Sequence, residues 1–187
     1  MGWTFTHKDS SLTTREFFER QFNHDKPAEN IRGKIIAFAA TWTTAYMAYE
    51  QIIGDTRKVF AIVCLLRHIP RAIDGYNFGY KDMDESMGPN ESKCPKTILE
   101  LLTPTEYEYA IEWRKRCWDR IKKRESLPKV KTGDWIKFTD PIKFTDGSIY
   151  QVFQFNGGSR FKTDHYMTYR IRNWRDREFA KIPPPTP

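Results

Sequence analysis

The spacing of the hydrophobic residues changes about two thirds of the way along this chain, and that change limits the folds open to it. Over 107–121, apolar residues recur every three or four positions, which is typical of a helix that buries one face. After 127–131 they alternate with polar residues between glycine turns, as they do in strands. The sequence therefore predicts an α+β fold in two parts: an N-terminal domain over 1–126 and a small all-β module over 127–182. A loose, proline-rich tail is predicted over 183–187.

The N-terminal domain is expected to be an antiparallel sheet with helices packed on it. Residues 13–16 are Thr-Thr-Arg-Glu, a capping box, and predict a helix over 14–22. The stretch 34–67 is rich in β-branched and aromatic residues and contains the turn-forming pair Gly54-Asp55, which predicts an antiparallel meander. Residues 39–51 also match helical spacing, so a helix remains an alternative there.

Glycines and prolines recur over 68–95, and their density predicts a long ordered loop. Loops of that length in compact domains are often functional. A short helix is predicted over 96–102. A longer helix is predicted to begin at 103–106, where Thr-Pro-Thr-Glu places threonine at the cap and proline at the first helical position, and to end near 124.

The C-terminal module is predicted from its turns and from a short repeat. Ile-Lys-Phe-Thr-Asp occurs at 136–140 and again at 142–146, which favours two short strands that fold over a corner. Asn-Gly-Gly-Ser at 156–159 tolerates positive φ and predicts a hairpin between 149–155 and 160–172. Several short strands of this kind are typical of an SH3-like or OB-like barrel.

The composition favours a polyanionic partner. The chain has 31 Lys and Arg against 24 Asp and Glu, which gives a formal charge of +7 and an isoelectric point near 9.3. Its three cysteines stand far apart without metal-ligand spacing, which predicts neither disulfides nor a zinc site and fits a reducing compartment. Because the sequence shows no secretion signal and no long apolar run, we expect a cytoplasmic protein without membrane contact.

The predicted loop supplies the first candidate for chemistry. Asp82, Asp84 and Glu85 are closely spaced acids that can bind a hard cation or act as acid and base. Met87 and Lys93, however, occupy the positions where a calcium loop needs glycine and glutamate, so no metal site is predicted. The alternative is that these acids cap turns and pair with nearby basic groups.

Cys94 is the second candidate for chemistry. Pro95 places its thiol near a predicted helix N-terminus, where the helix dipole stabilises a thiolate. A thiol nucleophile also needs a base, and His68 is the histidine nearest to Cys94 in the sequence. The sequence does not show whether the two meet, and a structural cysteine remains the alternative. No cofactor is predicted.

Two basic segments are candidates for contact with nucleic acid. The helix over 114–124 carries cations in its later turns, although the helix dipole favours that placement in any helix. The predicted hairpin interleaves cations with aromatic rings that are able to stack on unpaired bases, and alternation places Tyr166, Arg170 and Arg172 on its more exposed face. The predicted contact residues are Arg114, Lys115, Arg120, Lys122, Lys123, Arg124, Arg160, Lys162, Tyr166, Arg170, Arg172 and Trp174.

The central motif Gly-Tyr-Lys-Asp-Met-Asp-Glu-Ser-Met-Gly-Pro at 79–89, with Cys94-Pro95 and the segment 98–104 after it, resembles a family of uncharacterised proteins of bacteria, phages and mobile elements. Residues 1–8 share the resemblance, which covers most of the chain. It implies that many relatives have a cysteine at the position of Asn90, and the absence of that cysteine here weakens a metal or redox role for Cys94. The resemblance suggests a phage or plasmid accessory protein and assigns no catalytic residue.

Three functions are therefore kept open. The first is a non-enzymatic accessory protein of a phage or mobile element that binds nucleic acid through the basic helix and the hairpin. The second is an inhibitor or adaptor that binds a host protein, for example against a defence system, with the same rings and arginines as anchors. The third is an enzyme that uses Asp82, Asp84, Glu85 and Cys94. The oligomeric state is left open.

Overall fold

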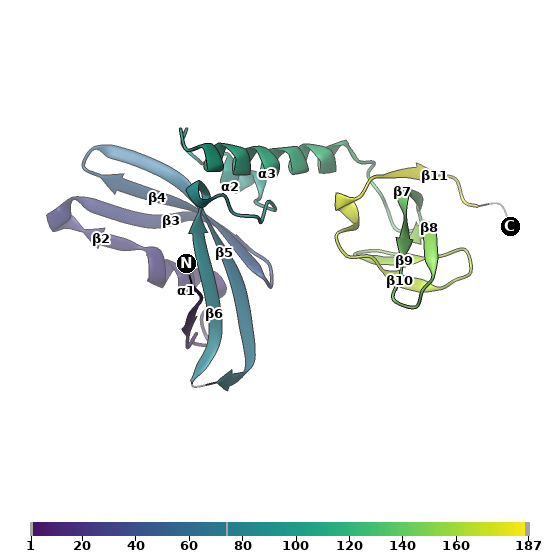
Figure 1. Cartoon of the computed structure of the whole chain (residues 1–187), viewed down its shortest axis with the longest axis horizontal. Coiled ribbons are helices and arrows are strands. Elements are labelled where there is room, and N and C mark those ends of the chain that lie inside the picture. The colour runs from purple at the N-terminus through teal and green to yellow at the C-terminus, as the bar shows by residue number, and fades with distance from the viewer. Residues whose placement is uncertain (1, 74, 186–187) are drawn as a thin grey trace. The chain divides into compact units, whose positions relative to one another are not determined.

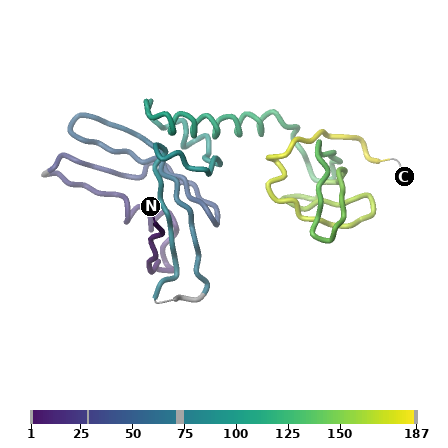
Figure 2. The backbone as a smooth tube through the Cα atoms, viewed as in Figure 1, coloured from purple at the N-terminus to yellow at the C-terminus, as the bar shows by residue number. Residues whose placement is uncertain are grey.

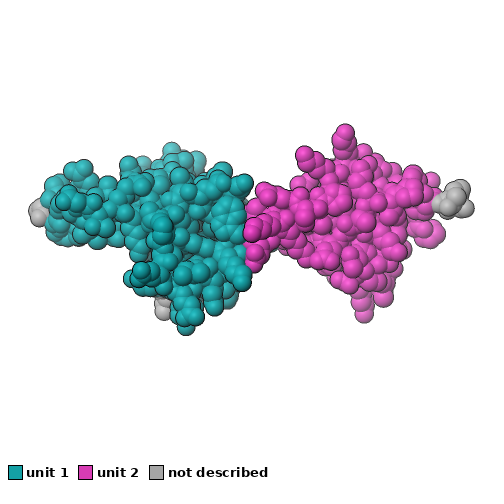
Figure 3. Space-filling view, turned by 90° about the horizontal axis from the view of Figure 1, so that it is seen from above, with its two compact units in different colours: residues 1–118 teal, residues 119–187 magenta. Residues whose placement is uncertain are grey.

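The computed structural model describes residues 2–73 and 75–185 (Figure 1). The chain divides into two compact units, 1–118 and 119–187 (Figure 3). The described residues of each unit form an antiparallel sheet with a hydrophobic core of its own. The predicted α+β class is therefore confirmed. The boundary between the units falls within a helix, and whether 1–126 or 127–182 is an independent domain stays a prediction. None of the helices in the described ranges is long and apolar enough to cross a membrane.

The described part of the first unit forms a six-stranded sheet in the order β1-β6-β5-β4-β3-β2, and its neighbouring strands are antiparallel. Figure 2 follows the central strands as a continuous meander. Gly54 (φ 58°) makes the predicted turn, and the helical alternative for 39–51 is wrong because these residues pair along two strands. The strands are β1 (Thr4–Thr6), β2 (His24–Lys26), β3 (Ile31–Ala40), β4 (Thr44–Ile53), β5 (Thr56–Ile73) and β6 (Tyr76–Asp84).

Helix α1 (Thr14–Phe22) packs on one face of this sheet. The predicted capping box is confirmed: the backbone N–H of Glu16 donates to the Thr13 hydroxyl, and that of Thr13 donates to the Glu16 carboxylate. Phe18 is completely buried, and its ring centroid lies 5.3 Å from that of Tyr80 on β6. The local cap therefore fixes where the helix begins, and burial of its aromatic face attaches it to the sheet.

Helix α2 (Lys96–Leu99) packs on the opposite face of the sheet against β3 and β4, and α3 (Glu108–Ser126) brings Cys117 near Tyr46 on the same face. Residues three apart on a strand point to opposite faces, and β4 shows this with two tyrosines. Tyr49 belongs to the core beneath α1, whereas the Tyr46 hydroxyl accepts a hydrogen bond from the backbone of Lys93 (3.1 Å), just before α2. The central strands are therefore buried on both faces.

The expectation of a long loop over 68–95 is wrong. Most of that segment continues β5 and forms β6, and the glycines that suggested a loop have other roles. Gly75 (φ 80°) lies at the turn between the two strands. Gly79 lies within β6, and a Cβ there would come 2.8 Å from the Phe5 ring. The glycine thus provides room for an aromatic ring on the neighbouring strand and does not interrupt pairing.

The predicted start of the long helix is also wrong. Thr103 does not cap α3, because it binds the edge of β5: its N–H donates to the Val59 carbonyl (2.9 Å), and its hydroxyl accepts from the Val59 N–H (3.2 Å). The helix begins at Glu108 instead and buries Ala110, Trp113 and Cys117. The short helix α2 ends at Leu99, three residues earlier than predicted.

The second unit contains, among its described residues, a five-stranded antiparallel sheet in the order β10-β9-β8-β7-β11. Phe138, Phe153 and Phe161 are almost fully buried and form the centre of its core. The strands are β7 (Trp135–Lys143), β8 (Ile149–Phe155), β9 (Arg160–Lys162), β10 (Thr168–Arg170) and β11 (Phe179–Ile182). The resemblance of this sheet to an SH3-like or OB-like barrel stays a prediction.

The predicted hairpin after β8 is confirmed, with Gly157 (φ 89°) and Gly158 (φ 62°) in its turn. Its second strand is shorter than the predicted 160–172, because a further turn over 163–167 divides it into β9 and β10. The first copy of the repeat lies within β7 and the second begins in its last two residues, Ile142 and Lys143; the pairing of β7 with β8 shifts between Lys137 and Ile142. The predicted corner is thus an irregularity within one strand.

Candidate nucleic-acid interface

The net positive charge of the chain comes entirely from the second unit. Residues 1–118 carry 16 Lys and Arg and 16 Asp and Glu, whereas residues 119–187 carry 15 and 8. The formal charge of +7 is therefore the charge of the second unit, and the first unit is neutral. A net charge of this size on 69 residues produces a field that attracts polyanions.

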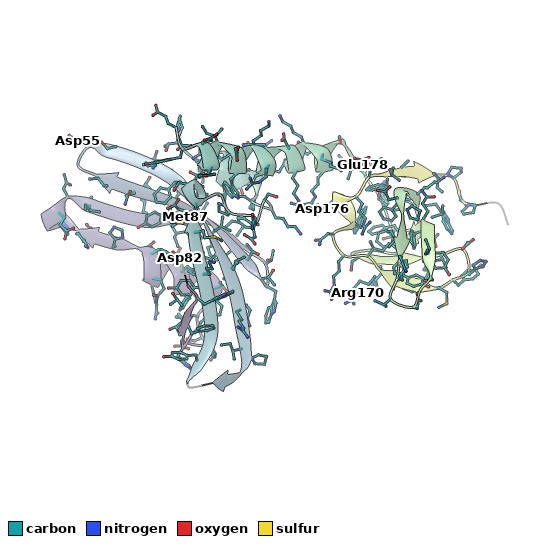
Figure 4. All side chains as sticks on the ribbon, viewed as in Figure 1. Asp55, Asp82, Met87, Arg170, Asp176 and Glu178 are labelled. Carbon is teal, nitrogen blue, oxygen red and sulfur yellow. The ribbon has the colours of Figure 1, made fainter. Side chains whose placement is uncertain are left out.

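The strand pair β9–β10 places two arginines side by side. Arg160 lies directly opposite Arg170, and Lys162 lies opposite Thr168. Phe161, between Arg160 and Lys162 in the sequence, is buried in the core. Because side chains alternate along a strand, Arg160 and Lys162 lie on the outer face of the sheet, and so does Arg170 opposite Arg160. Figure 4 labels Arg170, on the edge strand of this sheet. Both arginines are exposed, and Lys162 is half-buried.

In the described ranges, neither arginine nor Lys162 has an acidic partner within ion-pair distance. Like charges at directly opposite positions of an antiparallel pair destabilise the sheet. The positions of Arg160 and Arg170 therefore cost stability in the free protein. An anion bound between their guanidinium groups would remove that cost.

The turn between β9 and β10 exposes a further predicted contact residue. Tyr166 lies at its tip with 86% of its surface exposed, and its backbone has the left-handed φ of 61°. Arg172, just after β10, is exposed as well. The hairpin thus brings together Arg160, Lys162, Tyr166, Arg170 and Arg172 on a short stretch of two strands and their turn.

The structure corrects the expectation for Trp174. This residue begins a single 3-10 turn, η3 (Trp174–Asp176), and its ring packs in the core, 5.0 Å from that of Phe155. The indole N–H donates to the Gly158 carbonyl (2.9 Å). With 6% of its surface exposed, the ring offers no face for a base. The burial of Trp174 could not be predicted from the sequence, because several residues near it in the chain are exposed arginines.

Arg114 is likewise withdrawn from the contact surface, because it is held in a buried ion pair. Its guanidinium donates to both carboxylate oxygens of Glu85, with Nε 2.7 Å from Oε2, and to the Thr103 carbonyl (2.7 Å). The two side chains are 17% and 4% exposed. The two contacts with Glu85 hold α3 to the end of β6, and the third holds it to the segment around Thr103, so three of the five N–H donors of Arg114 are used within the first unit.

Three of the other six helix cations are also paired. Arg120 and Arg124 lie within ion-pair distance of Asp176, and Lys123 lies 2.9 Å from Glu178. For the remaining three, Lys115, Arg116 and Lys122, the described residues supply no ion pair, although the Arg116 guanidinium donates to the Pro89 carbonyl (2.7 Å). The basic helix is therefore a weaker candidate surface than the hairpin, since acids of the same unit already neutralise much of it.

The acids of the central motif do not form one site. Asp82 lies on β6 opposite Cys64, whereas Asp84 caps the turn η2 (Glu85–Met87) by accepting from the Ser86 N–H (2.8 Å). A pocket of about 210 Å³ is lined by Asp84 and Glu85 but not by Asp82 or Cys94. Within the described ranges no group of three His, Cys, Asp or Glu side chains is placed to hold a metal ion.

Cys94 does not have the environment of a reactive thiol. It is 2% exposed, and burial raises the pKa of its thiol instead of lowering it. Helix α2 after it has a single turn, so little dipole acts on the sulfur. His68 is on β5, where its ring stacks on that of Trp42 with the centroids 3.9 Å apart. The expectation of a stabilised thiolate is therefore wrong.

The first unit contains a cluster of Tyr49, His24 and Gly33 that was not predicted from the sequence. The Tyr49 hydroxyl donates to the Phe22 carbonyl (2.9 Å) and lies 3.0 Å from the Nδ1 atom of His24. Gly33 makes this possible, because a Cβ there would overlap the Tyr49 hydroxyl. A neighbouring pocket of about 420 Å³ is lined by His24 and Glu50, among others. These residues lie on three different strands, so no local sequence pattern predicts that they come together.

The charges at this pocket are already balanced. Arg57, with Lys34, holds the pKa of the Glu50 carboxyl below its ordinary value, and both basic groups form ion pairs with it. The pocket therefore presents a satisfied ion cluster, unlike the unpaired arginines of the β9–β10 hairpin.

Comparison with known proteins gives one match. The model of a family described as a domain of unknown function (DUF6927) matches residues 104–177. No curated protein and no solved structure matches the chain. The matched segment contains α3 and β7 to β10, and it holds all twelve predicted nucleic-acid contacts but not the acids of the central motif or Cys94. The similarity is thus to an uncharacterised family, and it covers the basic part of the chain.

Proposed function

We propose that this chain is a non-enzymatic accessory protein of a phage or mobile element that binds nucleic acid through the β9–β10 hairpin of its second unit. The observation that carries the proposal is the pair Arg160 and Arg170, which lie opposite each other, exposed and without acidic partners in the described ranges. Folding gains nothing from this arrangement, whereas phosphate groups would neutralise it.

The net charge supports the same reading, since the whole excess of +7 lies in the second unit. The hairpin contributes Arg160, Lys162, Arg170 and Arg172 to the contact. Four neutralised phosphates of a single strand give a slope of log affinity against log salt of about −3, or roughly 50-fold weaker binding at 200 mM than at 50 mM salt. The paired cations of α3 are expected to add less.

The test is a titration of labelled oligonucleotides followed by fluorescence anisotropy at several salt concentrations. The double variant Arg160→Glu/Arg170→Glu should lower affinity at least tenfold at about 50 mM salt and flatten the salt dependence. The control is Arg20→Glu/Arg67→Glu, which makes the same change in net charge at two exposed arginines of the first unit. Absence of binding at 50 mM salt, or an equal loss in both variants, would refute the proposal.

A further inference from the structure

Tyr166 has a backbone conformation that its side chain does not favour. Its φ of 61° lies in the left-handed region, where bulky side chains are strained. The other non-glycine residues with positive φ in the described ranges are Asn30 and Asn173, and asparagine tolerates this region far better. A tyrosine at this position therefore has a cost that glycine or asparagine would avoid.

The turn itself does not use the tyrosine ring. It is closed by backbone contacts around Thr163, which is 2% exposed: the Thr163 N–H donates to the Met167 carbonyl (2.9 Å), and the Tyr166 N–H donates to the Thr163 carbonyl (3.1 Å). The Met167 N–H also donates to the Thr163 hydroxyl (3.2 Å). In the part of the chain that the structure describes, the Tyr166 ring has neither a stacking nor a hydrogen-bonding partner.

Tyr169, on the same hairpin, has a ring that contributes to the packing of the second unit. Its centroid lies 4.0 Å from that of Phe144, and its hydroxyl contacts Ser148 and Asp146. Tyr166 instead exposes 86% of its surface at the tip. A strained position that holds an unused aromatic ring in solvent is a reason to look for a ligand.

The surroundings of the ring indicate what that ligand is. Lys162 ends the strand that enters the turn, and Arg160 and Arg170 follow on the same outer face, about 7 Å further along at the rise of a strand. An exposed ring at the tip of a hairpin whose strands carry a row of cations matches a ligand with flat aromatic groups on an anionic backbone. In a duplex both faces of each base are covered by its neighbours, so a ring finds a free face on unpaired bases only.

We propose that the β9–β10 hairpin recognises single-stranded nucleic acid, with one base stacked on Tyr166 and adjacent phosphates bound by Lys162, Arg160 and Arg170. This proposal rests on the proposed function and adds the class of nucleic acid. Tyr166 supplies preference for an unpaired strand, and the cations supply affinity that does not depend on strandedness.

The experiment measures anisotropy of a labelled 12-nucleotide DNA strand, the RNA strand of the same sequence and the corresponding DNA duplex, at about 50 mM salt, with the full chain. Tyr166→Gly removes the ring and relieves the strained φ, so the variant should be at least as stable as the parent. It should bind the single strand about 5- to 100-fold more weakly, as expected for the loss of one stacked base, and bind the duplex within about twofold of the parent.

Two further variants test whether the effect comes from the ring or from its hydroxyl, and whether it is specific to the tyrosine at this position. Tyr166→Phe should retain single-strand affinity within about threefold, because the ring face and not the hydroxyl makes the contact. Tyr109→Ala, at another exposed tyrosine, should leave affinity unchanged. Loss of single-strand affinity in Tyr166→Gly alone, for DNA or for RNA, supports the inference.

The failure of this inference is distinguishable from failure of the proposed function. If the parent chain binds none of the three oligonucleotides, the proposed function itself is wrong. If the parent binds and Arg160→Glu/Arg170→Glu abolishes binding, but Tyr166→Gly keeps full single-strand affinity or loses duplex affinity equally, the stacking inference is overturned while nucleic-acid binding stands.

Discussion

The ion pair of Glu85 and Arg114 gives the most direct test of how the central motif is used. Arg114→Met removes three hydrogen bonds, two to Glu85 and one to the Thr103 carbonyl. It leaves a carboxylate that is 4% exposed without its counter-charge. Removal of one partner of a buried ion pair costs about 3–5 kcal/mol, a large part of the 5–15 kcal/mol that stabilises an ordinary domain.

A second variant removes both charges at once. In Glu85→Leu/Arg114→Met no charge is left unpaired, and replacement of a buried pair by apolar residues is often neutral or stabilising. We therefore expect the double variant to be more stable than Arg114→Met alone by about 2 kcal/mol or more. Arg20→Met, at an exposed arginine of α1, is the control and should change stability by less than about 0.5 kcal/mol.

The assay is hydrogen exchange followed by mass spectrometry, because it reports on each unit separately. Amides of β5 should lose protection in Arg114→Met and regain it in the double variant, whereas amides of β8, in the second unit, should be unaffected. A cost below about 1 kcal/mol in the single variant, or a double variant no more stable than the single, would refute the view that this pair holds α3 to β6.

Two predictions follow from buried titratable groups. Cys64, Cys94 and Cys117 are at most 2% exposed, and burial raises the pKa of the Cys64 and Cys94 thiols. The native protein at pH 8 should therefore not react with Ellman's reagent within minutes, whereas the unfolded protein should show three reactive thiols. Rapid reaction of Cys94 in the native protein would contradict this prediction. Burial lowers the pKa of the His68 imidazole in the folded protein below its ordinary value of 6.5. As the pH falls through 6.5, the imidazole therefore binds a proton in the unfolded chain before it does so in the folded one. Folding stability should decline over this range, down to the pKa of His68 in the folded protein. Urea midpoints at pH 7.5 and 5.5 measure this, and His68→Gln should show a smaller decline; an identical decline would exclude His68 as a cause.

Local patterns predicted the elements whose shape depends on neighbouring residues. The capping box at Thr13 and Glu16, the turn at Gly54 and the hairpin turn at Gly157-Gly158 are all present, because a cap or a positive φ is decided within a few residues. The α+β class follows from the same information, since periods of 3.6 and 2 are properties of single elements.

Local patterns failed where a residue has a distant partner. Gly79 suggested a loop, but it lies in a strand because Phe5, 74 positions earlier, covers it. Thr103 has the sequence of a helix cap, but it binds Val59 on β5. In each case a contact with a strand that is distant in the sequence outweighs a weak local preference, and such contacts leave no trace at the spacing of a turn or helix.

The candidate site divides in the same way. Composition alone indicates that the second half of the chain is basic and aromatic, and alternation correctly indicated that Tyr166, Arg170 and Arg172 are exposed. Which cations remain available depends on the contacts made in the folded chain. Folding pairs Arg114 with Glu85 and Arg120 with Asp176, buries Trp174, and sets Arg160 opposite Arg170. Charge is a property of a residue type, whereas its neutralisation depends on which groups folding brings within a few ångströms.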